Sequence, residues 1–167
     1  KFIDSSDPPD WTEIERLWRG LLTRTRDINL LVWLCRARVR TASAMGLAQG
    51  LGMLADVLER WPRDVHPQAL IEGQLDPAMR ANALAALCDP EGLLDDVRDI
   101  VISGNAMRLL VRDVERAFSM ARSGATPEAT AVRQQLDELR IRARGDAGAA
   151  TRFLGQAAYA AQRVQQW

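Results

Sequence analysis

The sequence is poor in the residues that carry most enzyme chemistry. Among 167 residues it has one histidine, His66, one lysine, Lys1, and two cysteines, Cys35 and Cys88. The cysteines are far apart and each lies in an apolar run, so we expect two buried thiols rather than a disulfide or a metal-binding pair. Free thiols of this kind favour the cytoplasm as the compartment.

Long hydrophobic runs and targeting segments are also missing. No apolar run reaches the roughly 18 residues that a membrane span needs, and no signal peptide is visible at the start. We therefore expect a cytoplasmic protein without direct membrane insertion. Because the chain starts at Lys1 without a methionine and stops on Trp167, we interpret it as a piece of a longer protein.

The charge balance excludes a global attraction to nucleic acid or membranes, since the formal net charge is zero. The charges are nevertheless unevenly spread. Residues 16–40 carry seven arginines against one acid, Asp27, whereas residues 89–99 carry five acids against Arg98. A dipole of this kind suits a protein partner better than a nucleic-acid duplex.

The stretch from Asp27 to Trp61 organises the rest of the chain. Residues 28–35 are apolar at every position but one, which predicts a helix in the middle of the domain. A second helix is expected over 44–61, because Leu47, Leu51, Leu54, Leu58 and Trp61 follow at helical spacing. The glycines Gly46 and Gly50 lie off this stripe, where another backbone can approach closely; they follow no strand and precede no lysine, so they form no phosphate-binding loop.

Helix signals recur along the remaining chain and strands are nearly absent. Helical periodicity or cap signals predict helices over about 11–22, 28–42, 44–61, 77–87, 91–101, 112–122, 127–142 and 147–164, with a loop at 63–75. We expect an all-α fold: a compact bundle of about five to six helices, followed by an antiparallel hairpin of the last two helices. The expected division is residues 1–122 as one helical domain and 123–167 as a hairpin extension packing on it.

The search for a reactive site finds weak candidates. His66 could act as a base with Cys35 or Cys88, but a loop histidine that bonds a helix end is the preferred interpretation. Three acids of one segment could hold a cation, yet a solvated face is preferred; these are Asp95, Asp96 and Asp99. Structural roles at helix ends are expected for Asp27, Arg80 and Asn82.

Nucleic-acid binding remains an alternative. Arginines lie near Trp18 and Trp33, and residues 28–42 and 44–61 could be taken for a helix-turn-helix. The second of these helices is poor in residues that read bases. We therefore place this interpretation below a protein-docking role.

Several short segments, in order, resemble the ImpA N-terminal domain, which opens the TssA proteins of the bacterial type VI secretion system. The resemblance covers roughly Trp11 to Phe118. The segments that carry it are Trp11 with Leu21-Leu22, Thr23-Arg24-Thr25-Arg26-Asp27, Val32-Trp33-Leu34, Gly46-Leu47-Ala48-Gln49-Gly50-Leu51, Val65-His66-Pro67, Arg80 with Asn82-Ala83-Leu84-Ala85-Ala86-Leu87, and Leu110-Val111-Arg112-Asp113-Val114-Glu115.

The resemblance implies a bacterial, non-enzymatic docking domain that assists baseplate assembly, or primes or caps the tube and sheath. Its partners would be baseplate, sheath, tube or membrane-complex components, with oligomerisation mainly through a C-terminal portion outside this sequence. The family supplies no catalytic, cofactor or metal residues. We expect the arginine-rich surface to bind the partner, through Arg16, Arg19, Arg36 and Arg40. The alternatives are a helical regulator that binds nucleic acid and, below it, a Cys/His hydrolase.

Overall fold

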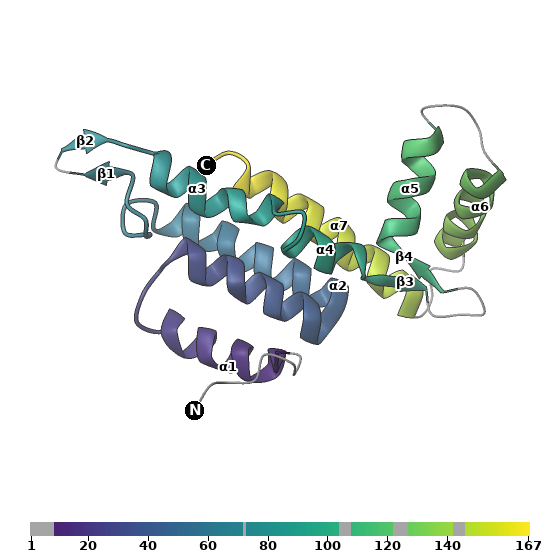
Figure 1. The fold of residues 1–167 in the computed structure, drawn as a ribbon, viewed down its shortest axis with the longest axis horizontal. Helices are drawn as coiled ribbons and strands as arrows, with labels where there is room; N and C mark the ends of the chain where they lie inside the picture. The colour runs from purple at the N-terminus through teal and green to yellow at the C-terminus, as the bar shows by residue number, and fades with distance from the viewer. Residues whose placement is uncertain (1–8, 72, 104–107, 122–126, 142–145) are drawn as a thin grey trace.

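The protein is a helical bundle with two small β-hairpins (Figure 1), seen in a computed structural model that describes residues 9–71, 73–103, 108–121, 127–141 and 146–167. This confirms the all-α class. The elements are α1 (Trp11–Leu22), α2 (Ile28–Arg60), β1 (Leu70–Ile71), β2 (Gln74–Leu75), α3 (Ala78–Ala85), the 3-10 turn η1 (Ala86–Cys88), α4 (Leu93–Arg98), β3 (Val101–Ser103), β4 (Leu109–Leu110), α5 (Val111–Ala121), α6 (Pro127–Ile141) and α7 (Asp146–Val164).

The central element, α2, is an antiparallel pair of helices. Its axis reverses at Ala42 and Ser43, where φ/ψ are −135°/15° and 52°/−135°, so residues 28–41 and 44–60 run side by side in opposite directions (Figure 1). The two helices expected from the sequence, with a break near residue 43, are therefore confirmed. Asp27 caps the first half, because its Oδ1 accepts a 2.7 Å hydrogen bond from the Asn29 amide.

Two glycines let the halves of α2 touch through their backbones. A Cβ on Gly46 would lie 1.8 Å from the carbonyl oxygen of Arg38, and one on Gly50 would lie 2.9 Å from the Cα of Cys35. The close approach predicted for these glycines is confirmed. The predicted stripe is also confirmed, since Leu47, Leu51, Leu54 and Leu58 are all buried.

The first helix, α1, lies along α2 (Figure 1). Asp10 caps it, and its Oδ1 accepts hydrogen bonds of 3.0 and 3.1 Å from the amides of Thr12 and Glu13. None of its residues is fully buried, and Leu17 and Leu21 are about half exposed. The helix therefore leaves part of its apolar face open.

Arg80 fixes the segment between α2 and α3. Its guanidinium is buried and donates hydrogen bonds to the carbonyl oxygens of Pro62, Val65 and Pro67 at 3.1–3.3 Å. The pinning role expected for Arg80 is confirmed, whereas Asn82 is exposed. The expected loop at 63–75 needs a correction, because β1 and β2 form a short antiparallel hairpin within it.

The expected boundaries after α3 also need corrections. The helix expected over 91–101 ends at Arg98, and Val101 begins β3, which pairs with β4. Cys88, which was expected to be buried, is exposed. Breaks expected at 104–105, 123–125 and Gly145 lie outside the described residues.

The last three helices correct the expected hairpin. Helix α6 packs chiefly on α5, and the two stand at one end of the molecule, while α7 turns back and lies along α2 (Figure 1). Small residues explain why α7 packs on α2 rather than on α6, since Ala157 and Ala160 of α7 enter the core beside Leu47 and Leu51. The division at residue 122 remains a prediction. Within the described residues, no helix is both long and apolar enough to span a membrane.

Candidate docking surface

Three tryptophans gather where α1 meets the first half of α2. The rings of Trp18 and Trp33 stack with centroids 6.2 Å apart and an interplanar angle of 11°. Trp11 lies nearby, because the Arg36 guanidinium is 5.6 Å from the centroids of both Trp11 and Trp33. The aromatic groups therefore form one cluster joined by an arginine, and cation–π contacts of this kind contribute about 0.5–2 kcal/mol each.

A buried carboxylate holds the arginines under this cluster. Asp96 of α4 is 2 % exposed; its Oδ2 accepts a 2.7 Å hydrogen bond from Nε of Arg36, and its Oδ1 pairs with Arg40. Arg40 also lies 5.5 Å from the Trp11 ring centroid. Asp96 thus orients the guanidinium groups of Arg36 and Arg40, which also contact indole rings. We call Trp11, Trp18, Trp33, Arg36, Arg40 and Asp96 the tryptophan–arginine cluster.

The solvated acidic face expected at residues 95–99 therefore needs a correction at Asp96. Asp95 and Asp99 are exposed, in agreement with the expectation, but Asp96 is not. Helical spacing explains the difference, because Asp96 lies three residues after the buried Leu93 and four before the buried Ile100. Within the described residues, no group of three or more His, Cys, Asp or Glu side chains is placed to hold a metal ion.

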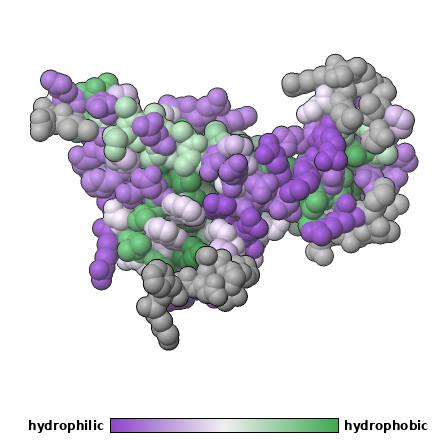
Figure 2. Space-filling view, in the orientation of Figure 1, coloured by the Kyte–Doolittle hydropathy of each residue, from purple (hydrophilic) through white to green (hydrophobic). Residues whose placement is uncertain are grey.

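Apolar side chains continue the cluster at the surface. Trp33 is 45 % exposed, Leu17 52 % and Leu21 46 %. A shallow groove of about 580 Å³ runs along α1 and includes Leu17, Trp18 and Leu21. Figure 2 shows hydrophobic residues at the surface over α1 and the adjoining part of α2, in a face that is otherwise largely hydrophilic. An apolar patch bordered by cations is typical of a protein-binding site.

An ion-pair network ties α1 to α2 behind this surface. Glu15 accepts hydrogen bonds from Thr41 at 2.7 Å and from Arg38 at 2.9 Å. Burial acts to raise the pKa of Glu15, but the hydrogen bonds from Thr41 and Arg38 outweigh it, so the pKa is lowered. The carboxylate stays charged at neutral pH and holds α1 in place.

All four arginines expected to bind a partner form ion pairs within the chain. Arg16 makes two hydrogen bonds to Glu13, at 2.6 and 2.7 Å, and Arg19 lies 2.9 Å from Glu15. Arg16 and Arg19 are mostly exposed, whereas Arg36 and Arg40 contact Asp96 and retain less exposure. The structure thus places two of them in the tryptophan–arginine cluster and two along the outer side of α1.

Comparison with known proteins identifies the family of this chain. The family model described as ImpA, N-terminal, type VI secretion system matches residues 2–89. The chain belongs to this ImpA N-terminal family. The match ends before Phe118, where the resemblance in the sequence was expected to end.

The relatives that this ImpA N-terminal chain matches are longer than the chain itself. It is 29 % identical over 82 residues to the type VI secretion system component TssA1 of Pseudomonas aeruginosa, covering 49 % of this chain and 24 % of TssA1. The chain thus spans about a quarter of that relative's length. Its fold is similar to the N-terminal domain of TssA from Burkholderia cenocepacia, with a TM-score of 0.64 at 20 % identity, covering 98 % of this chain and 68 % of that one.

The geometry of this ImpA N-terminal chain gives little support to a Cys/His hydrolase. Burial raises the pKa of the Cys35 thiol to about 12, and a nucleophilic cysteine needs the opposite shift. The backbone of His66 is used structurally: its amide donates to the Arg26 carbonyl and its carbonyl accepts from the Ile28 amide, both at 2.7 Å. His66 thus bonds a helix end, as preferred from the sequence.

The helix-turn-helix interpretation does not match the geometry either. A DNA-reading pair crosses at about 90–120° through a short turn, whereas the halves of α2 lie antiparallel with backbone contact at Gly46 and Gly50. The second half is also largely buried, with Leu47, Leu51 and Leu54 in the core.

Sequence reasoning missed the exposure of Leu17 and Leu21 and the burial of Asp96. The apolar periodicity of α1 showed which side of the helix is apolar but not how much of that side α2 covers. The burial of Asp96 had a signal, its position on the stripe of Leu93 and Ile100. No signal in the sequence indicates the exposure of Trp33, since this residue lies in a segment that is apolar on every side.

Proposed function

We propose that this chain is a non-enzymatic docking module of a TssA-like component of a bacterial type VI secretion system. The proposal places its work in the cytoplasm, in contact with a baseplate, sheath, tube or membrane-complex component. Membership of the ImpA N-terminal family supports a role in a type VI secretion system. Oligomerisation would rest on parts of the protein outside this sequence.

The observation that carries the docking role is the half-exposed Trp33 stacked on Trp18 beside Leu17 and Leu21. Burying these apolar side chains against a partner would release about 25 cal/mol per Å². Arg36 and Arg40 are already held by Asp96, so binding would require little ordering of either side chain. Arg16 and Arg19 would meet acidic groups at the edge of the interface.

A pull-down tests this proposal. The tagged protein, added to lysate of a cell making the secretion apparatus, is expected to recover a sheath, tube, baseplate or membrane-complex component identified by mass spectrometry. Leu17→Glu is expected to reduce that recovery at least tenfold, because it places a charge in the centre of the patch.

A matched variant controls for non-specific loss. Leu75→Glu changes a leucine that is 77 % exposed on β2, away from the tryptophan–arginine cluster, and should leave recovery unchanged. The proposal fails if no component of the apparatus is recovered, or if both variants lose it equally while circular dichroism shows both folded.

A further inference from the structure

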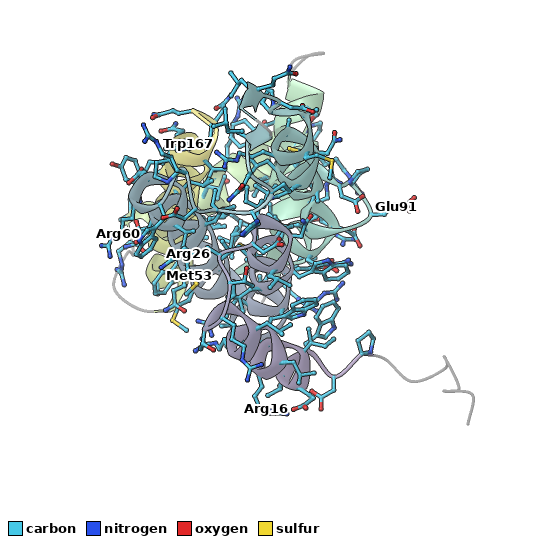
Figure 3. All side chains as sticks on the ribbon, turned by 90° about the vertical axis from the view of Figure 1, so that its left-hand side faces the viewer. Arg16, Arg26, Met53, Arg60, Glu91 and Trp167 are labelled. Atoms are coloured by element: carbon cyan, nitrogen blue, oxygen red, sulfur yellow. The ribbon has the colours of Figure 1, made fainter. Side chains whose placement is uncertain are left out.

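A second groove lies on another face of the molecule and is lined by both halves of α2 and by Arg19 of α1. It has a volume of about 560 Å³, and its lining includes the apolar residues Leu34, Met53, Val57 and Trp61. Figure 3 shows Met53 with Arg26 and Arg60 on one side and Glu91, beside the tryptophan–arginine cluster, on the other. The volume lies within the range of about 300–1,000 Å³ that is typical of ligand pockets.

Gly52 lines this groove and packs against no other side chain of the described residues. A Cβ on Gly52 would meet nothing within 4 Å, in contrast to Gly46 and Gly50, which contact the other half of α2. Glycine inside a helix costs about 1 kcal/mol relative to alanine. Since the described part of the chain gains no packing from Gly52, its effect is to deepen the groove.

The groove is more basic than acidic at its rim. Arg19, Arg38 and Arg60 line it against one acid, Asp56. Asp56 accepts a 2.7 Å hydrogen bond from Arg163, which also binds Glu59, and Glu15 pairs with Arg19 and Arg38. Arg60 makes no salt bridge among the described residues, which leaves its charge open to a partner.

A second cation extends the basic end of the groove. The Arg26 guanidinium lies 4.5 Å from the centroid of the Trp61 ring. Like Arg60, it makes no salt bridge within the described ranges of the chain. Two available cations therefore border an apolar floor that includes Met53, which is 44 % exposed.

We propose that this groove binds an acidic amphipathic helix of a partner protein. The apolar side of that helix packs on Met53 and over Gly52, and its carboxylates pair with Arg60 and Arg26. Two observations support this proposal: the cations Arg26 and Arg60, unpaired among the described residues, complement an acidic helix, and Gly52 leaves space for its apolar side chains. It does not depend on the tryptophan–arginine cluster, so each surface can be tested without the other.

Binding is tested with two synthetic peptides of roughly 16 residues, about four helical turns. Both carry leucine at helical spacing; one has glutamate at the remaining positions and the other lysine. In heteronuclear NMR titrations of the whole protein, the glutamate peptide is expected to shift the Gly52 and Met53 amides and the Trp61 indole signal. The lysine peptide is expected to leave them in place.

Two variants locate the site. Gly52→Leu fills the floor, and Arg60→Glu reverses the rim charge; each is expected to weaken the glutamate peptide at least tenfold. Gly155→Leu is the matched control, because Gly155 on α7 also has nothing within 4 Å of a built Cβ. Its affinity for the peptide should be unchanged, and neither leucine variant should lower the melting temperature.

Three results overturn the assignment. Equal binding of the lysine peptide would show that the charge of the groove does not select the partner. An absence of shifts at Gly52, Met53 and Trp61 would show that the peptide does not bind in this groove. Self-association in sedimentation equilibrium that Gly52→Leu abolishes would assign the groove to a second copy of this chain instead.

Discussion

The carbonyl oxygen of Arg38 occupies the space above Gly46, 1.8 Å from where a Cβ of that glycine would lie. This contact sets the separation of the two halves of α2, on which α1, α3, α4 and α7 all pack. A backbone oxygen cannot rotate away as a side chain does. The distance between the halves therefore depends on the absence of a methyl group at this position.

Gly46→Ala is expected to lower the free energy of unfolding by at least about 3 kcal/mol, because the added methyl forces the halves of α2 apart. Chemical denaturation monitored by circular dichroism measures this change. Gly20→Ala is the control: a Cβ there meets nothing within 4 Å, and stability should rise by about 1 kcal/mol. Equal effects of the two substitutions would contradict the packing described for Gly46.

Asp96→Ala is expected to destabilise the protein by about 2 kcal/mol, because Arg36 and Arg40 lose their shared carboxylate. The cost stays below that of a fully buried pair, since both guanidinium groups partly reach water. Tryptophan fluorescence should also change as the arginines leave the rings of Trp11 and Trp33.

The neighbouring Asp95→Ala serves as the comparison, because Asp95 is exposed on the same helix and its salt bridge to Arg112 is long, at 4.0 Å. Its effect on stability should stay within about 0.5 kcal/mol, with the fluorescence unchanged. If both alanine variants unfold at the same denaturant concentration, Asp96 does not anchor the cluster.

Arg163→Met is expected to destabilise the protein at neutral pH and much less in acid. Arg163 donates to Glu59 at 2.6 and 2.7 Å and to Asp56 at 2.7 Å, which joins α7 to α2. The hydrogen bond from Arg163 lowers the pKa of Glu59 below its ordinary value of 4.5. The contribution of Glu59 to stability is therefore present above pH 4.5 and is lost as the pH falls through its folded-state pKa.

Thermal melts of Arg163→Met and the original protein across that pH range measure the effect. The gap between their melting temperatures should shrink below pH 4.5. Arg152→Met changes an exposed arginine on the same helix, and its melting temperature should follow that of the original protein at every pH. A gap for Arg163→Met that does not change with pH would argue against the ion pair.

Much of the architecture could be predicted from local pattern. The stripe of Leu47, Leu51, Leu54 and Leu58 repeats at helical spacing, and Asp10 and Asp27 are recognisable caps, so helix positions followed from short-range chemistry. The resemblance to the ImpA N-terminal family came from the same stretches. These features depend on residues close together in sequence.

Long-range pairing could not be predicted in the same way. A short connection suggested that α6 and α7 form a hairpin, but Ala157 and Ala160 fit the core beside α2, and α7 packs there instead. At the candidate site, Arg36 and Arg40 were expected to bind a partner, yet both contact Asp96, which lies about 60 residues away in the sequence. Which acid meets which arginine depends on the packing of α4.

The position of α7 has a consequence for how this protein can be shortened. The family match stops at residue 89, but Ala157, Ala160 and Val164 of α7 complete both clusters of buried side chains. A fragment cut at that boundary would leave Cys35, Val39 and Leu51 facing water on one side. The segment that matches the family model is therefore shorter than the segment needed to complete the hydrophobic core.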